Sequence, residues 1–132
     1  MRDHRKLKTF HLADRLALAV YQSTRSFPRE ENFGLTSQTR RAAVSIACNI
    51  VEGCARHTEQ EYLRFLDMAY GSSRELEYQL SLAKRLGYLD EHAMHHVVPL
   101  SEEVGRALHG LIRAIRFPKT PDKMIAAEGS SA

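Results

Sequence analysis

Features that mark secreted, membrane-spanning or nucleotide-binding proteins are scarce in this chain of 132 residues. Cysteine occurs only twice, and Cys48 and Cys54 stand six residues apart on one predicted helix. Their side chains then point away from each other, so we expect two reduced thiols. No stretch approaches the roughly 20 apolar residues of a membrane span, and the N-terminus lacks the apolar region of a signal peptide. We therefore expect a cytoplasmic protein.

Clustered glycines, strand-like alternation and internal repeats are also absent. The seven glycines are isolated singles, so the chain has no glycine-rich loop that would cradle a phosphate group. Apolar residues do not alternate with polar ones over any stretch, which argues against β-strands. These absences disfavour the nucleotide-binding α/β classes.

Charge of one sign is only slightly in excess. The formal net charge is +3, and residues 1–8 alone hold Arg2, Arg5, Lys6 and Lys8 against Asp3. The remaining chain is balanced, so the basic character belongs first to the N-terminal segment. It is a weak argument for an anionic partner.

The sequence is rich in residues that favour helices. Apolar residues recur at helical spacing, and this pattern predicts four helices over roughly 8–25, 36–54, 58–86 and 90–117. Short connections between amphipathic helices predict an all-α fold, an antiparallel up-down-up-down four-helix bundle. We expect residues 1–9 to form a basic segment leading into the first helix, 10–117 to form the bundle and 118–132 to form a disordered tail.

Local signals place some helix boundaries. Thr36 or Ser37 is expected to open the second helix, Thr58 and Glu61 form a capping box before the third, and Asp90 is a candidate N-cap for the fourth. Gly53 is expected to terminate the second helix or to pack closely, and the third is expected to stop at Gly87.

Two features of the loops and of the fourth helix need tertiary structure to settle them. Phe27 and Phe33, in the loop after the first helix, are expected to fold back onto the core. Pro99 interrupts the fourth helix while its apolar stripe continues, so we expect a kink there. A short helix, a turn and a new helix capped by Ser101 is the alternative.

Surface patterning points to assembly. A second face of the second helix carries a polar row without lysine, namely Gln38, Arg41, Ser45, Asn49 and Glu52. Apolar residues also lie outside the core stripes of the first and third helices, at Leu18, Tyr21, Leu63, Tyr70, Tyr78 and Leu82. Several such residues on adjoining helices predict a homo-oligomer. Gly71, in the middle of a helix, costs about 1 kcal/mol relative to Ala and is expected to face another backbone.

Metal and catalytic sites find little support. Glu52, Glu75 and Glu77 could be imagined as a di-iron set, but the Glu-x-x-His pairs that such a site requires are missing. His92 and His96 share a helix face without further ligands. Cys54 and His57 lack an orienting third group. We expect no metal, no cofactor and no enzymatic activity.

Arginines are the candidate nucleic-acid contacts. Arg40 and Arg41 lie early in the second helix and Arg56 follows it, where guanidinium groups could meet phosphates. Arg113 and Arg116 are explained equally well as cations that complement the dipole at a helix C-terminus.

The chain resembles the 23S rRNA-intervening sequence protein family, also called the four-helix bundle protein family. The matching pieces run in order over roughly residues 10–117: Val20-Tyr21, Phe27-Pro28, Phe33 to Gln38, Arg41 to Ile46, Asn49 to Gly53, Arg56, Glu61, Phe65-Leu66, Ala69, Gly71-Ser72, Glu75 to Glu77, and Leu86 to Tyr88. Cys48, Val51 and the extended C-terminal tail depart from the pattern.

The resemblance implies an antiparallel four-helix bundle that assembles into a homopentamer around a central channel. Members are encoded within intervening sequences of bacterial large-subunit rRNA genes or elsewhere. A similar bundle, the accessory variability protein of diversity-generating retroelements, is a basic pentamer that engages a reverse transcriptase and nucleic acid, but that role transfers only by analogy. By motif match, Ser45, Asn49, Glu52, Glu75 and Glu77 are expected to make inter-helix or inter-subunit polar contacts.

Two functional hypotheses follow. The first is a non-enzymatic, oligomeric accessory factor that binds RNA or DNA, with Arg40, Arg41 and Arg56 as its first phosphate contacts. The alternative is a structural or partner-binding module that binds no nucleic acid.

Overall fold

The computed structural model describes residues 1–119, and within that range all regular structure is helical. Four α-helices make up the body: α1 (Lys8–Ser23), α2 (Leu35–Cys54), α3 (Glu59–Arg85) and α4 (Glu91–Arg116). Short 3-10 turns, η1 (His4–Lys6), η2 (Thr24–Ser26) and η3 (Arg29–Glu31), flank α1 or connect it to α2. The predicted tail beyond residue 119 lies outside the described residues.

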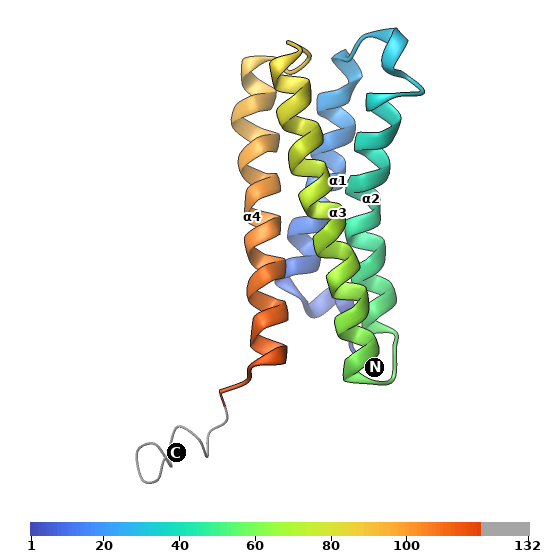
Figure 1. The fold of residues 1–132 in the computed structure, drawn as a ribbon, viewed down its shortest axis with the longest axis vertical. Coiled ribbons are helices and arrows are strands. Elements are labelled where there is room, and N and C mark those ends of the chain that lie inside the picture. The colour runs from blue at the N-terminus through green and yellow to red at the C-terminus, as the bar shows by residue number, and fades with distance from the viewer. Residues whose placement is uncertain (120–132) are drawn as a thin grey trace.

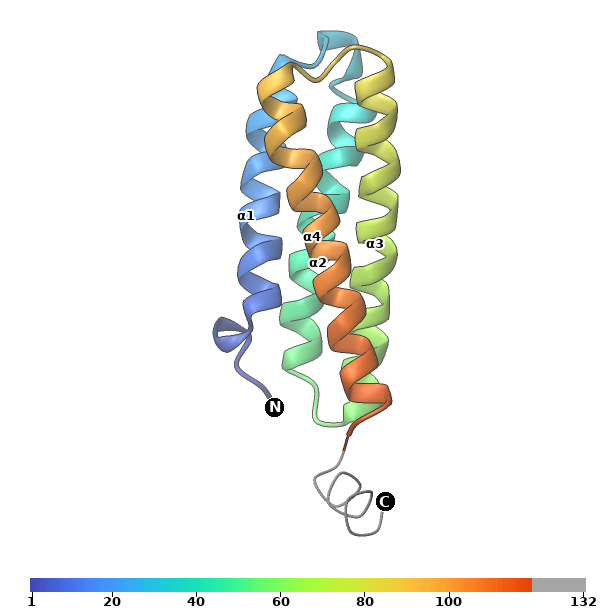
Figure 2. The same cartoon turned by 90° about the vertical axis from the view of Figure 1, so that its left-hand side faces the viewer.

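The four helices form a closed bundle in which each helix packs against two neighbours. α1 contacts α2 and α4, and α3 contacts the same two helices. The colour gradient in Figures 1 and 2 shows that the chain reverses direction at each of its three connections. One end therefore carries the α1–α2 and α3–α4 loops, while the other carries the N-terminus, the α2–α3 loop and the end of α4. The predicted all-α four-helix fold is confirmed.

Side-chain caps explain where α3 and α4 begin. The Thr58 hydroxyl accepts a hydrogen bond from the Glu61 amide at 3.1 Å, and Asp90 accepts one from the Ala93 amide at 2.7 Å. Each bond satisfies an amide that has no partner within the helix. Both predicted N-caps are confirmed.

Residues of the connecting loops determine where α2 begins and where α3 ends. α2 begins at Leu35, because the Glu31 carboxylate reaches forward and accepts a hydrogen bond from the Leu35 amide at 2.9 Å. The prediction that Thr36 or Ser37 opens this helix is therefore wrong. Gly87 follows α3 with a φ of 78°, a left-handed conformation that glycine adopts without a steric penalty.

α4 is one continuous helix through Pro99. Proline removes one backbone hydrogen bond, the one that the carbonyl of His95 would accept. His95 and Pro99 are both exposed, so water can reach that carbonyl. The alternative of two helices separated by a turn is wrong, while the kink remains a prediction.

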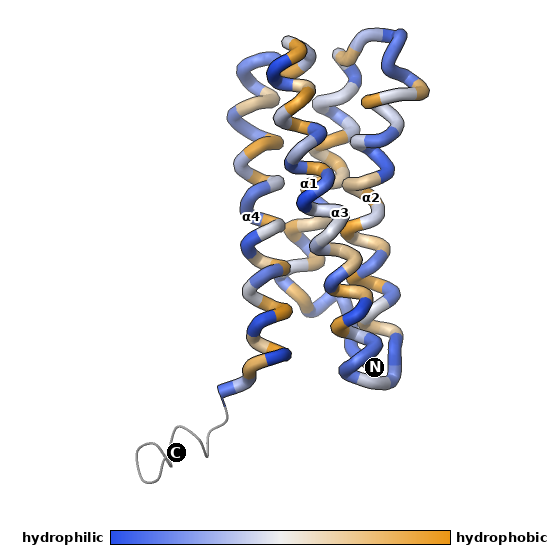
Figure 3. The backbone as a smooth tube through the Cα atoms, viewed as in Figure 1, coloured by the Kyte–Doolittle hydropathy of each residue, from blue (hydrophilic) through white to orange (hydrophobic). Residues whose placement is uncertain are grey.

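The core is built from the apolar stripes of all four helices. Figure 3 shows hydrophobic and hydrophilic residues recurring in turn along each helix, and the hydrophobic ones meet inside, among them Leu16, Ile46, Leu66 and Leu108, each fully buried. None of the helices within residues 1–119 is long and apolar enough to cross a membrane.

The two loop phenylalanines behave differently. Phe27 is buried and its ring lies 5.4 Å from that of Tyr88, whose hydroxyl donates a hydrogen bond to Glu31 at 3.0 Å. This cluster ties the two loops together. Phe33 is 99% exposed, so the prediction that it covers the core is wrong.

The extra apolar residues fall into two groups. Leu63, Tyr70 and Leu82 are partly buried and pack against the core of their own chain. Leu18, Tyr21 and Tyr78 remain 61%, 43% and 60% exposed. The apolar surface that could be covered by another subunit is therefore smaller than the sequence pattern indicates.

Candidate nucleic-acid interface

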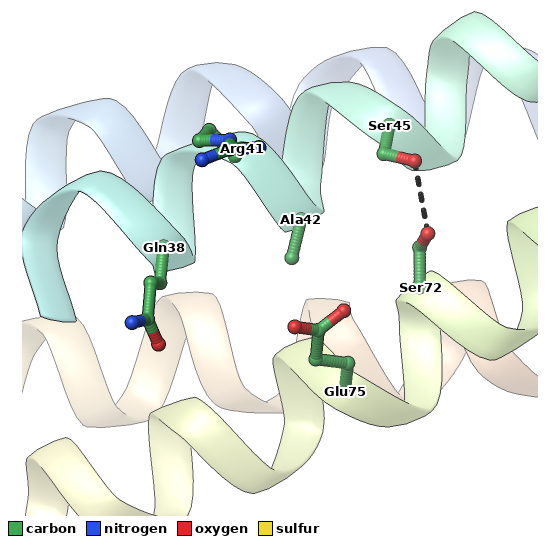
Figure 4. A pocket seen from close by; sticks show the side chains of 6 residues that line it. All are labelled: Gln38, Arg41, Ala42, Ser45, Ser72 and Glu75. Atoms are coloured by element: carbon green, nitrogen blue, oxygen red, sulfur yellow. Dashed lines mark hydrogen bonds between the residues drawn. The ribbon is translucent and has the colours of Figure 1, made fainter. Parts of the chain in front are cut away.

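A polar groove runs between α2 and α3 (Figure 4). It is lined by Gln38, Arg41, Ala42 and Ser45 from α2 and by Ser72 and Glu75 from α3. The hydroxyls of Ser45 and Ser72 are hydrogen-bonded at 2.9 Å across the groove. Of the predicted polar contact residues, Ser45 thus bonds to a neighbouring helix.

The other polar residues of this face bond locally. Asn49 donates to the Ser45 carbonyl at 2.9 Å and to its hydroxyl at 3.1 Å. Glu75 accepts a hydrogen bond from Gln79 at 3.3 Å, and Glu52 is exposed. Asn49 and Glu75 therefore contact side chains or backbone of their own helices.

Glu77 belongs to a different face from Glu75. Glu77 forms an ion pair with Arg74 at 3.0 Å. Its carboxylate also lies close to Gly105 of α4, because a Cβ added to that glycine would be only 2.7 Å from a carboxylate oxygen of Glu77. Glu75 and Glu77 therefore lie on opposite sides of α3 and cannot bind one metal ion together.

The other candidate ligands are histidines. The His92 and His96 rings stack 6.2 Å apart, and within the described range no three His, Cys, Asp or Glu residues gather as a metal site.

The pair of Cys54 and His57 lacks the environment that nucleophilic catalysis requires. Cys54 is buried, whereas His57 is exposed. Burial raises the pKa of the Cys54 thiol, while reactive cysteines have a lowered pKa. The adjacent Tyr62 is also buried, which raises its pKa to about 12.

The three candidate arginines do not form one patch. Arg40 donates to the Thr24 hydroxyl at 2.8 Å and to the Tyr21 carbonyl at 3.3 Å, and its guanidinium carbon lies 4.6 Å from the Tyr21 ring. It thereby fastens the start of α2 to the end of α1. Arg41 is exposed in the groove. Arg56 lies beyond the far end of α2, about 24 Å from Arg40 at 1.5 Å per residue.

Cations instead gather at one end of the bundle. Figures 1 and 2 show that the N-terminal segment, the α2–α3 loop and the end of α4 share this end. We call residues 1–11, 52–68 and 109–119 the terminal end. It contains nine Lys or Arg residues: Arg2, Arg5, Lys6, Lys8, Arg56, Arg64, Arg113, Arg116 and Lys119. It contains five acidic residues: Asp3, Glu52, Glu59, Glu61 and Asp67. The other described residues, 12–51 and 69–108, carry nine basic and nine acidic residues, so the positive excess is confined to the terminal end.

Two of the acidic residues at the terminal end form ion pairs with arginines of the same chain. Asp3 pairs with Arg5 at 3.0 Å, and the hydrogen bonds from Arg5 hold the pKa of Asp3 below its usual value. Asp67 pairs with Arg116. Among residues 1–119, by contrast, Lys6, Lys8, Arg56, Arg64 and Arg113 form no ion pair with another described residue.

Several of these arginines lie over aromatic rings. The guanidinium carbon of Arg2 is 4.0 Å from the centre of the Tyr62 ring, and the Arg2 amide donates to the Cys54 carbonyl at 2.7 Å. Arg56 and Arg64 lie 4.7 and 4.8 Å from the centre of the Phe65 ring. Such contacts stabilise a cation without neutralising it, so the positive charge remains available to a ligand.

The sequence pattern located the N-terminal part of this surface and singled out Arg56, Arg113 and Arg116, but it did not include Arg64 and did not place these residues together. Arg64 and Arg113 are far from residues 1–8 in the chain, and only the reversal of direction at each loop brings them to the same end. The signal was present in the predicted topology: an N-terminus, a second loop and the last helical turn of a four-helix bundle share one end.

Comparison with known proteins identifies relatives. The family model of the 23S rRNA-intervening sequence protein matches residues 5–110. A crystal structure of a protein of unknown function from the S23 ribosomal protein family of Bacteroides thetaiotaomicron is similar in fold, with a TM-score of 0.72. Sequence identity is 22%, and the similarity covers 80% of this chain and 95% of that one. No curated protein matches the chain.

Proposed function

Because the chain belongs to the 23S rRNA-intervening sequence protein family, we propose that it is a non-enzymatic, cytoplasmic accessory protein that binds nucleic acid as a homo-oligomer. The observation that carries this proposal is the segregation of charge. Nine basic and five acidic residues share the terminal end, while the rest of the described chain is balanced. A surface of this kind attracts phosphates and gains affinity by releasing their counterions.

Assembly would strengthen such a surface. An excess of four positive charges on one chain supports modest affinity, whereas copies related by rotational symmetry around one axis present it several times over. The resemblance to the family implies a pentamer, and Leu18 and Tyr78, both more than half exposed, are the apolar residues that a neighbouring copy would cover.

Binding to a labelled mixed-sequence RNA, measured by anisotropy over a salt series, tests the proposal. We expect binding at low salt that weakens steeply between about 50 and 200 mM. Replacing Lys6, Lys8 and Arg113 with Gln should weaken binding and reduce the slope of log K against log salt by roughly 2 to 3 units if all three meet phosphates.

A variant with the same change in charge at the other end is the control. Arg25, Arg29 and Lys84 lie in or near the loops opposite the terminal end, and replacing them with Gln should leave the salt slope almost unchanged. Equal losses in the two variants would show that net charge alone matters. Absence of binding at the lowest salt would refute nucleic-acid association and favour a structural or partner-binding module.

Oligomerisation is tested by light scattering during size exclusion. We expect a mass several times that of the 15.0 kDa chain. Replacing Leu18 and Tyr78 with Ser should lower that mass. A monomer in the unaltered protein would contradict the assembly part of the proposal.

A further inference from the structure

Aromatic rings accompany the cations at the terminal end. Phe117, the residue that follows α4, is 66% exposed, and the guanidinium carbon of Arg113 lies 5.3 Å from its ring centre. Phe10 on α1 is half-buried between two imidazoles, with ring centres 4.8 Å from His4 and 5.4 Å from His11. Exposed or partly exposed rings at the terminal end therefore come from two segments, the start of α1 and the residue after α4.

We infer that the terminal end selects single-stranded over double-stranded nucleic acid, an inference that rests on the proposed function and names its substrate class. Bases of a single strand are free to stack on aromatic side chains while the phosphates meet lysine and arginine. In a duplex the base faces are already stacked on each other, so the same rings gain nothing and only the phosphate contacts remain.

We assign the preference for single strands to Phe117. It is the most exposed of the Phe and Tyr rings at the terminal end, and it follows a helix whose last turn carries Arg113 and Arg116. A base stacked on its free face would place the adjacent phosphates near Arg113. Arg113 forms no ion pair with another residue in 1–119, so its charge is not neutralised within the chain.

The opposite end supplies a matched comparison. Phe33 is 99% exposed, but it lies in the loop between η3 and α2, within the part of the chain where basic and acidic residues are equal in number. Its neighbours Glu30 and Glu31 are acidic. A ring in that setting should not bind nucleic acid, so Phe33→Leu controls for the loss of an exposed ring.

The test compares a labelled 20-nucleotide oligouridine RNA with a blunt RNA duplex of the same length, in one buffer at low salt. We expect the single strand to bind at least about tenfold tighter. Phe117→Leu should weaken single-strand binding by roughly tenfold, the effect of losing about one stacked base, and change duplex binding less than twofold. Phe33→Leu should change neither. Oligodeoxythymidine in a parallel arm distinguishes RNA from DNA.

A second readout reports stacking directly. An oligonucleotide that carries 2-aminopurine should lose fluorescence when bound to the unaltered protein, and that loss should diminish with Phe117→Leu at saturating protein. Light scattering of Phe117→Leu should give the same oligomer mass as the unaltered protein. A changed mass would assign Phe117 to a subunit contact instead and overturn its role in stacking.

The outcomes separate the two proposals. If neither oligonucleotide binds, the proposed function fails. If both bind equally, or if Phe117→Leu weakens both to the same extent, nucleic-acid binding stands and single-strand selection is overturned. Single-strand preference that survives Phe117→Leu overturns the assignment to this ring.

Discussion

Replacing Gly53 with Ala tests the packing of α2 on α3 most directly. Gly53 lies in the last turn of α2 and is buried. A Cβ there would come within 2.9 Å of the Phe65 Cβ and 3.2 Å of the Tyr62 Cδ1, with the Tyr62 carbonyl at 3.4 Å. The nearest atom is attached directly to the α3 backbone, so it cannot swing away as the end of a flexible side chain would.

Two opposing effects set the size of the change. Alanine favours a helix over glycine by up to about 1 kcal/mol, and less in a terminal turn. Inserting a methyl group into a packed interface typically costs about 1–3 kcal/mol. The interface term should win, so we expect Gly53→Ala to lower the free energy of unfolding by about 1–2 kcal/mol. For a domain of this size the melting temperature should fall by roughly 4–8 °C.

Gly110→Ala is the matched control. Gly110 lies inside a helix, and a Cβ on it would meet no atom within 4 Å. We expect this change to raise the free energy of unfolding by about 0.5–1 kcal/mol, because only the helix preference acts. Urea denaturation followed by circular dichroism measures both variants. A midpoint for Gly53→Ala at or above that of the unaltered protein would refute the close packing of these helices.

Three further predictions concern pH, a hydrogen bond and assembly. Burial raises the pKa of Tyr62 to about 12, whereas the unfolded value is about 10, so the unfolded chain ionises first. The contribution of Tyr62 to the free energy of unfolding is therefore fully present below about pH 10 and is lost between about pH 10 and 12. In urea titrations over this pH range, Tyr62→Phe should make the loss of stability with rising pH smaller. An equal loss in the two proteins would contradict the prediction. Ser72→Ala removes the 2.9 Å hydrogen bond to Ser45 and should lower the free energy of unfolding by about 1 kcal/mol. A double-mutant cycle on Ser45 and Ser72 measures the interaction energy of the pair. An interaction energy near zero would mean that the bond contributes nothing to stability. If a neighbouring copy packs on exposed Gly71, Gly71→Ala should lower the oligomer mass measured by light scattering, whereas an unchanged mass would place the contact elsewhere.

The helical pattern was sufficient to predict the class of fold, because burying an apolar stripe at helical spacing leaves few alternatives to a bundle. Caps made by residues next to the helix, such as Thr58 and Asp90, were predictable for the same local reason. The start of α2 was not, since its cap comes from Glu31 in the preceding 3-10 turn. Phe27 and Phe33 share a loop and a residue type, and no local pattern distinguishes them. Phe27 joins the core cluster and packs against the ring of Tyr88 from the other loop, whereas Phe33 points to solvent.

Among the candidate site residues, the limits of prediction have a physical cause. Helical spacing placed Arg40 and Arg41 side by side on α2, but it could not show that Arg40 bonds to the end of α1. It also could not show that, among residues 1–119, no atom would come within 4 Å of a Cβ added to Gly71. Contacts between helices depend on their rotation and register, which no single helix determines.

The sequence by itself determined the four helices, most of their boundaries and the basic N-terminal segment, because helix preference, capping and local charge act over a few residues. The tertiary structure decided where the charge gathers. Packing four helices with alternating directions brings residues 1–11, 52–68 and 109–119 to one end, and it is their proximity in space that turns a slight excess of charge into a localised basic surface.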